Sequence, residues 1–209
     1  MAAPRMRRRP TGAFRRSRGR VSARFTASQA LILRNLVSQV AELMGDVTDP
    51  GPAVPGTTGP PAGPARPEEP EASLEELAAL LGTAGPTSPP DDPVLARLLP
   101  DGYRDDPEAA GEFRRYTEQD LRSGKVAAAQ TVLATLPAKG GQVRLGPEDA
   151  QAWLRALNDV RLAIGTLLGI TEDYEDELEQ ASWADPRSAY LEVYHWLGYV
   201  QDSLVRALW

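Results

Sequence analysis

The chain has 209 residues, of which 25% are charged and 42% are hydrophobic, and its formal net charge is −6. These values are typical of one globular domain with appendages. It contains no cysteine, which excludes disulfides, zinc–thiolate sites, iron–sulfur clusters and a thiol switch in this chain. No apolar run approaches the roughly 18 residues of a membrane span. No apolar segment follows the basic N-terminus as it would in a secretory signal. We therefore expect a cytoplasmic protein with no membrane partner.

Charge is distributed unevenly along the sequence. Residues 1–25 contain nine arginines and no acidic residue, whereas the rest of the chain has 14 basic and 29 acidic residues. The two parts carry formal charges of +9 and −15, which together give −6. Because residues 1–12 are short, charged and terminal, we predict that they form a disordered basic arm attached to an acidic body.

The segment that follows alternates apolar and arginine side chains, which is typical of a β-hairpin. A two-residue turn at Arg18-Gly19 would pair Arg16 with Val21 and place the apolar side chains on one face. An isolated hairpin is only marginally stable, so we expect this face to pack on helices. The opposite face would either contact an acidic protein or nucleic acid, or only protect an edge strand. The candidate contact residues are Arg15, Arg16, Arg18, Arg20 and Arg24.

Residues 13–45 are predicted to comprise this hairpin and the first core helix, which Thr26 or Ser28 caps and Gly45 ends. We expect the buried side chains of this helix to be Leu33, Leu36, Val40 and Leu43, with Ile32, Val37 and Met44 beside them. Proline and glycine dominate residues 46–91, which predicts a flexible insertion that contains one short helix at residues 73–82.

Residues 92–209 are predicted to form a helical core that makes a single domain with residues 13–45. Asp92-Pro93 and Asp106-Pro107 are helix-start signals, and Ser123-Gly124 is a candidate kink or break in the second helix. The last helix is expected to start at Asp185-Pro186 and to run to the C-terminus.

A short segment, QVRLG, follows Gly-Gly and is a candidate third strand. The longest apolar helical pattern, residues 152–169, comes next and is expected to be the hub of the core. The predicted fold class is thus mainly α. It is a compact bundle of about five to six helices with a small N-terminal β-hairpin, to which the third short strand could be added.

Polar residues interrupt the hub helix, and burial without partners would cost each of them about 1–3 kcal/mol. We predict that they meet polar side chains of the helix that starts at Pro107. In that helix, Glu118 has arginines four residues before and after it, which is the spacing of helical salt bridges. We favour a structural network over a ligand site, because buried charge can fix packing specificity. Its members are Arg115, Thr117, Glu118, Asp120, Arg122, Asn158, Asp159 and Arg161.

The sequence gives little evidence of a catalytic, cofactor-binding or metal-binding motif. His195 is the sole histidine, and the di-iron site that its Glu192-x-x-His195 pair would suggest needs a second such pair. We expect a surface histidine. The acidic run at residues 172–179 lacks the glycine and spacing of a calcium loop, so a solvated loop is favoured. The alternatives are contact with a basic partner, such as this chain's own arginine arm, and cation binding. Phosphate-loop, dinucleotide and zinc-protease motifs are absent from the sequence. We predict no catalytic residue, no metal and no cofactor, and hence no enzyme.

Three segments in order resemble one known family: DPVLARLLPDGYRDDPEAAGEFRRYTEQDLRSGK, then WLRALNDVRLAIGTLLGITED, then WLGYVQDSLVRAL. They are similar to an actinobacterial family of small conserved proteins, the domain-of-unknown-function family numbered two thousand and seventeen. The resemblance covers residues 14–45 and 92–208, and the Pro/Gly-rich stretch between them reads as a variable insertion.

The resemblance implies a regulatory role linked to transcription. The family includes a proposed oxidative-stress regulator that acts with a sigma factor at promoters and uses a cysteine pair. This chain has no cysteine, so such a switch cannot operate in it. We expect a non-enzymatic protein that binds a protein partner, such as a sigma factor, through the helical body or the hairpin. Direct nucleic-acid binding is the first alternative, and a small-ligand binder or enzyme built on the polar network is the second. The last helix is rich in aromatic residues, so it could form half of a dimer interface or the final layer of the core.

Overall fold

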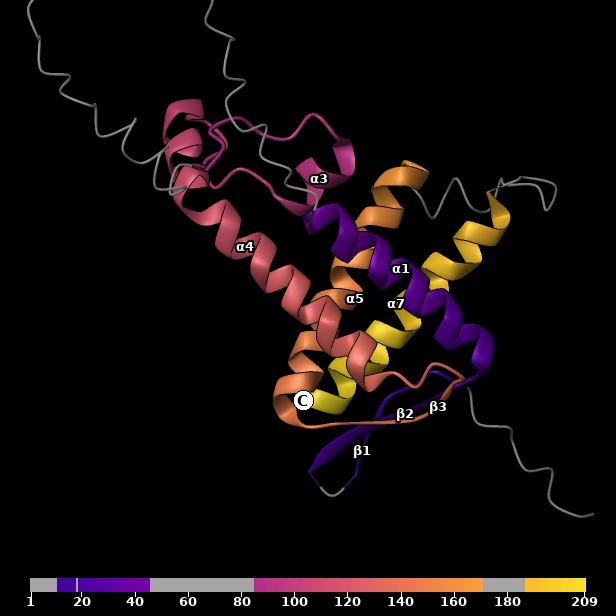
Figure 1. Cartoon of the computed structure of the whole chain (residues 1–209). Coiled ribbons are helices and arrows are strands. Elements are labelled where there is room, and N and C mark those ends of the chain that lie inside the picture. Colours follow the sequence, from indigo (N-terminus) through magenta and orange to yellow (C-terminus); the bar gives the residue numbers. More distant parts are fainter. Residues whose placement is uncertain (1–10, 18, 46–84, 171–186) are drawn as a thin grey trace, which may run out of the picture.

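The computed structural model of the protein describes residues 11–17, 19–45, 85–170 and 187–209. Within these ranges, five helices form a bundle with a three-stranded antiparallel sheet at one end (Figure 1). The mainly α fold class is therefore confirmed, and so is the third strand. The helices are α1 (Ala27–Gly45), α3 (Pro93–Leu98), α4 (Pro107–Thr135), α5 (Pro147–Leu168) and α7 (Ser188–Leu208). The strands are β1 (Arg15–Ser17), β2 (Arg20–Phe25) and β3 (Gly141–Leu145).

The hairpin has the register that its sequence predicts, with Arg16 opposite Val21 and Ser17 opposite Arg20. Strand β3 pairs with the other side of β2, so the sheet order is β1-β2-β3. Alternate side chains of a strand point to opposite faces. Val21, Val143 and Leu145 are buried on the face that packs against the helices.

Local signals set where the helices begin. Thr26 and Gln29 form a capping box, in which each side chain accepts a hydrogen bond from the backbone N–H of the other. Asp92 and Asp106 accept backbone N–H bonds at the starts of α3 and α4, and a proline follows each of them in the first turn. The predicted helix at residues 73–82 and the predicted helix start at Asp185 lie outside the described residues.

Helix α4 is continuous from Pro107 to Thr135, so the suspected break at Ser123-Gly124 is wrong. Both residues are exposed, and no atom lies within 4 Å of the position a Gly124 Cβ would take. A glycine inside a helix costs only about 1 kcal/mol. The packing of α4 against α1 and α5 offsets this cost.

The core differs in detail from the predicted stripes. In α1 the buried face is rotated, so that Leu36 and Leu43 are only partly buried. In α5 the sequence places Leu167 on an apolar stripe, but 74% of its surface is exposed. The buried side chains of α1 are Ala30, Leu33, Val37, Val40 and Met44.

An aromatic cluster joins the sheet to the helices. The Trp153 ring of α5 lies 5.4 Å from the ring of Phe14 and 5.8 Å from that of Phe25, measured between centroids. Phe25 also contacts Trp196 of α7, at 6.5 Å. The indole N–H of Trp153 donates a 2.7 Å hydrogen bond to the Thr135 hydroxyl. One side chain therefore connects the sheet, α4 and α5.

We expect Trp153→Ala to lower the free energy of unfolding by about 3–5 kcal/mol, because it removes a fully buried aromatic ring and leaves a cavity. The matched control is Trp209→Ala, because Trp209 is 80% exposed. Its effect should stay within about 0.5 kcal/mol. Urea unfolding followed by circular dichroism measures both variants. Equal stability of the two would contradict the central position of Trp153.

Candidate functional site

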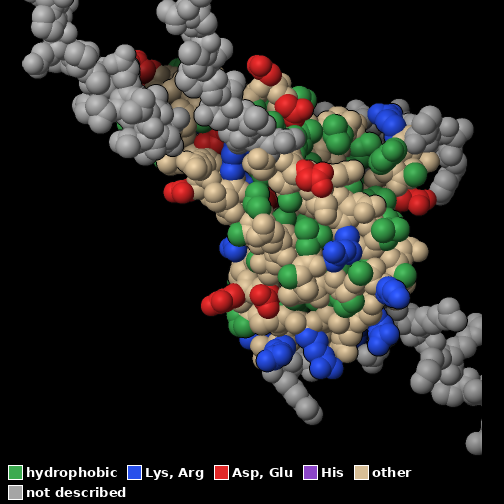
Figure 2. Space-filling model, in the orientation of Figure 1, with side chains coloured by type: hydrophobic (Ala, Val, Ile, Leu, Met, Phe, Trp, Pro, Cys, Tyr) green, Lys and Arg blue, Asp and Glu red, His purple; other side chains and the backbone are tan. Residues whose placement is uncertain are grey.

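The outer face of the sheet carries the clearest concentration of charge. Arg15 of β1 and Arg144 of β3 flank Ser22 of β2, while Arg20 and Arg24 lie at the two ends of β2. All four arginines are exposed. Figure 2 shows basic side chains gathered at the end of the molecule where the sheet lies. We call these four residues the arginine face.

The arginine face has no acidic counterpart within the sheet, because the three strands contain no acidic residue. Among the described residues, its only side-chain hydrogen bond runs from Arg144 to Gln142 and measures 3.3 Å. No ion pair to another described residue neutralises these guanidinium groups. A shallow depression of about 270 Å³ lies between Arg15, Arg24 and Gln142. The face can therefore receive carboxylate or phosphate groups.

The other candidate arginines of the hairpin lie elsewhere. By register Arg16 is on the same side as the apolar residues, yet it is exposed near the turn end of the hairpin. Arg18 lies outside the described residues. Arg144, which joins the face through β3, was not among the arginines predicted from the sequence. The only signal for it was the QVRLG strand candidate, whose arginine would alternate with Val143 and Leu145.

A second polar group lies inside α4 and is centred on the buried residue Glu118. The carboxylate of Glu118 pairs with Arg114 and Arg122, one turn away on either side. The guanidinium of Arg114 also bonds the Leu99 carbonyl at 2.9 Å and the Asp101 carboxylate at 2.7 Å. These contacts tie the loop after α3 to α4. The arginine–glutamate pairs that the sequence predicted on α4 therefore lie in the interior, with Arg114 and Glu118 buried and Arg122 partly buried. On an exposed face of the helix they would have been solvated.

The pKa of Arg114 reflects opposing effects. Burial disfavours the charged guanidinium and lowers its pKa, but hydrogen bonds and charges from Asp101 and Glu118 outweigh burial and raise the pKa above its ordinary value. Arg114 therefore stays protonated and can compensate the buried carboxylate of Glu118.

The polar residues of α5 face two different helices. The carboxylate of Asp159 accepts a 2.6 Å bond from the Lys125 ammonium of α4. Arg161 bonds Gln201 of α7 at 2.9 Å and lies 5.0 Å from the centroid of the Tyr194 ring. Two positions along a helix differ by about 200°, so Asp159 and Arg161 point to nearly opposite sides. The amide of Gln201 donates to Asn158 at 3.4 Å.

The eight residues of the predicted network are thus distributed over several contacts. Glu118 and Arg122 meet each other, and Asn158 and Arg161 are joined through Gln201. Thr117 bonds the Phe113 carbonyl of its own helix, Arg115 lies near the Tyr116 ring, and Asp120 is exposed. The sequence had paired Glu118 with the arginine four residues before it, Arg114, but Lys125, Asp101 and Gln201 were not predicted as partners. No local spacing could have found these three, because each lies on a different helix or loop from the residue that it bonds.

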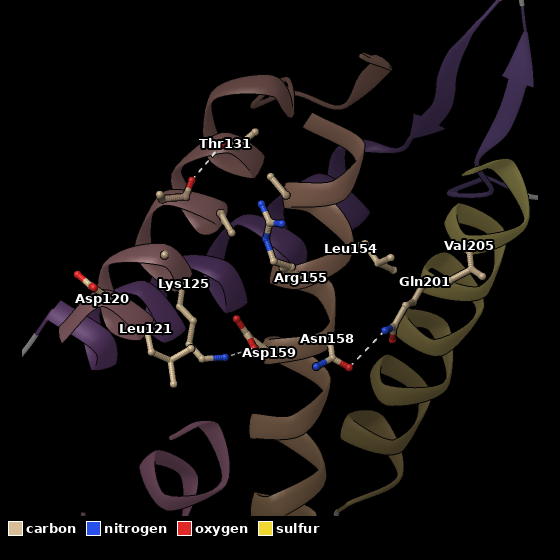
Figure 3. Close-up of a pocket in the computed structure, with 14 residues that line it drawn as sticks. Asp120, Leu121, Lys125, Thr131, Leu154, Arg155, Asn158, Asp159, Gln201 and Val205 are labelled. Atoms are coloured by element: carbon tan, nitrogen blue, oxygen red, sulfur yellow. Dashed lines mark hydrogen bonds and ion pairs between the residues drawn. The ribbon is translucent and has the colours of Figure 1, made fainter. Parts of the chain in front are cut away.

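An open groove of about 780 Å³ runs between α4, α5 and α7 (Figure 3). Small side chains such as Ala128 and Ala152 line it, and the Lys125–Asp159 pair and Asn158 supply polar groups. Its volume is within the range of small-ligand sites. The opposite charges of Lys125 and Asp159 satisfy each other at its wall. Among the described residues, no group of three or more metal-ligating side chains occurs.

Comparison with known proteins identifies the family. The sequence model of a family described as "Domain of unknown function (DUF2017)" matches residues 8–208. The chain belongs to this family. The arginine face, the Glu118 ion pairs and the groove all lie within the matched DUF2017 region. No solved structure matches the chain.

Among DUF2017 relatives, a protein of Mycobacterium tuberculosis (strain H37Rv) and one of Mycobacterium bovis are each named "Oxidative stress regulator AosR". Each is 39% identical to this chain over 132 residues, which cover 57% of this chain and 59% of the relative. A relative from Mycobacterium leprae is 37% identical over the same number of residues. The match thus spans about three fifths of the length of these curated relatives.

Removing Arg114 should be strongly destabilising, because it would leave the buried Glu118 carboxylate with Arg122 as its remaining cationic partner. We expect Arg114→Ala to lower the free energy of unfolding by about 3–5 kcal/mol. The control is Arg206→Ala, which breaks an i,i+4 pair whose side chains are 78% and 53% exposed. It should cost no more than about 1 kcal/mol. Equal losses in thermal unfolding would argue against a buried network.

The Lys125–Asp159 pair allows a compensation test. Its side chains are 16% and 6% exposed, so Lys125→Met leaves a nearly buried carboxylate without its cation. We expect this change to cost about 3 kcal/mol, and the double variant Lys125→Met/Asp159→Leu to recover most of the loss. Chemical denaturation of the four proteins in the cycle measures the coupling. Additive losses would show that the two side chains do not depend on each other.

Proposed function

We propose that this DUF2017 protein is a regulator that acts by binding and not by catalysis, and that it binds an acidic protein partner through the arginine face. The observation that carries this proposal is the set of exposed arginines without ion pairs to other described residues. Carboxylates that meet such a face gain charge-assisted hydrogen bonds, and the bidentate geometry of arginine favours them.

The names of the relatives support a regulatory role, because the two AosR proteins are named as oxidative stress regulators. We further propose that the partner belongs to the transcription machinery in the cytoplasm, as the family resemblance implies. The chain has no cysteine, so a response of this chain to oxidants would not pass through a thiol. Binding, and not thiol chemistry, is then the property of this chain to be tested.

Nucleic acid is the other polyanion that an arginine face can bind. The formal net charge of −6 disfavours it, because most of the molecule would repel a phosphate backbone. An acidic protein segment needs to approach only the sheet, so we favour the protein partner. A small ligand in the groove between α4, α5 and α7 is a second candidate, supported by the groove volume of about 780 Å³.

The arginine face is tested by charge reversal. We expect Arg20→Glu/Arg24→Glu to weaken binding of fluorescein-labelled polyglutamate by about tenfold or more, since a loss of about 1.4 kcal/mol is tenfold. Arg97→Glu/Arg104→Glu changes two other exposed arginines by the same charge and should have a much smaller effect. Fluorescence anisotropy measures both.

Duplex DNA, titrated in parallel, distinguishes the polyanions. Tighter binding of DNA than of polyglutamate, with a steep loss of affinity as salt rises, would replace the protein partner by nucleic acid. Equal affinities of the two charge-reversal variants for polyglutamate would remove the arginine face from the proposed function.

A further inference from the structure

The two edges of the sheet differ in how their backbone groups are satisfied. On the outer side of β1, the Phe14 N–H donates a 2.9 Å hydrogen bond to the Ser203 hydroxyl of α7. Helix α7 contacts β1 at this edge. At the other edge, no described residue gives or accepts a hydrogen bond to the outward backbone groups of β3. Within the described part of the chain, the β1 edge is thus bonded to α7 at Phe14, whereas the β3 edge has no bonded partner at either outward residue.

The register identifies which groups of β3 are open. Ser17 lies opposite Arg20 with two residues between them in the sequence, so they form the first hydrogen-bonded pair of the hairpin. Backbone groups alternate in direction along an antiparallel strand, so Arg20, Ser22 and Arg24 bond toward β1. The carbonyl of Arg24 does accept a 2.7 Å bond from Gly12, on the β1 side.

The intervening residues of β2 consequently bond toward β3. Val21 pairs with Leu145, and Ala23 pairs with Val143. The N–H and C=O groups of the residues between them, Gln142 and Arg144, then point away from the sheet. Their side chains are exposed as well, on the same side as Arg24. Gln142 and Arg144 thus each have outward backbone N–H and C=O groups without a described partner and a side chain that faces solvent.

We propose that the open edge of β3 receives an extended acidic segment of the partner as a fourth strand. This inference rests on the proposed function and adds the conformation and side-chain pattern of the bound segment. Main-chain hydrogen bonds to Gln142 and Arg144 supply affinity, as in other cases where a peptide extends a sheet. Directly opposed residues of two strands project to the same face, so side chains opposite Gln142 and Arg144 lie beside the arginine face.

Charge and polarity set the sequence of the segment. Acidic side chains at alternate positions would pair with Arg144 and Arg24, which lack ion pairs to the described residues. The positions between them project to the face of Val143 and Leu145, both buried, and favour apolar residues. The partner segment is therefore an extended strand in which acidic and apolar residues alternate. A helix or a nucleic acid cannot satisfy the backbone of β3 in this way.

Amide hydrogen exchange of the unmodified protein tests the strand directly. The probe is a capped peptide in which glutamate and valine alternate. We expect the Gln142 and Arg144 amides to exchange rapidly in the free protein and at least about tenfold more slowly with the peptide bound. The Val143 and Leu145 amides are bonded to β2 and should be protected in both states.

Two further peptides serve as controls for this exchange experiment. A peptide of the same composition with glutamates and valines in separate blocks should give little protection, and alternating lysine and valine should not bind. Binding of the alternating acidic peptide without protection of Gln142 and Arg144 overturns the fourth strand but leaves an acidic partner in place. No binding of any acidic peptide, polyglutamate included, overturns both proposals.

A matched pair of variants gives a second test. Gln142→Pro removes one outward N–H without changing charge, and a proline is compatible with the open edge of a sheet. We expect it to weaken binding of the alternating peptide by about fivefold or more, because an edge hydrogen bond contributes about 1 kcal/mol. Gln142→Ala keeps the backbone donor and should bind like the unmodified protein.

Circular dichroism first verifies that both variants are folded. Polyglutamate binding should change little in either variant, because both keep every arginine. Equal affinities of the two folded variants for the alternating peptide would overturn the proposal. If Gln142→Pro does not fold, the exchange experiment on the unmodified protein decides.

Discussion

The position of Trp153 is the constraint on which the rest of the molecule depends. Its ring contacts Phe14, which immediately precedes β1, and Phe25 of β2, and its indole N–H bonds Thr135 at the end of α4. Because the apolar side of the sheet is held against α5 by these rings, the alternation of the strands forces the other side outward. The exposure of the arginine face is therefore a consequence of aromatic packing, since the arginines themselves make no ion pairs with other described residues.

Polar contacts specify how the helices pack around that centre. Glu118, with Arg114 and Arg122, fixes the loop after α3 against α4, while Lys125 and Asp159 fix α4 against α5. Arg161 is directed toward α7 instead. Buried ion pairs of this kind add little net stability, because desolvation consumes most of the Coulomb energy. Their effect is to penalise other arrangements of the same helices, in which a buried charge would be left unpaired.

Charge segregation then links the architecture to the proposed role. The sheet carries the arginine face, and the chain as a whole is acidic. A partner that approaches the sheet end meets favourable charge, whereas one that approaches the helices meets repulsion. The edge of β3 lies directly beside this charge. The arginines that attract an acidic partner and the backbone groups that hydrogen-bond it are therefore at the same place. A DUF2017 protein without cysteine can thus take part in regulation through what it binds.

The sequence by itself determined the elements whose signals are local. Alternation and the Arg18-Gly19 turn specified the hairpin register, and Asp92 and Asp106 specified two helix starts, because both depend on residues only a few positions apart. Tertiary structure decided which polar groups meet. Asp159 and Arg161 are neighbours in sequence, but helix rotation separates them, and their partners Lys125 and Gln201 come from distant helices. The open edge of β3 likewise exists only after β3 pairs with β2, which lies more than a hundred residues away in the sequence.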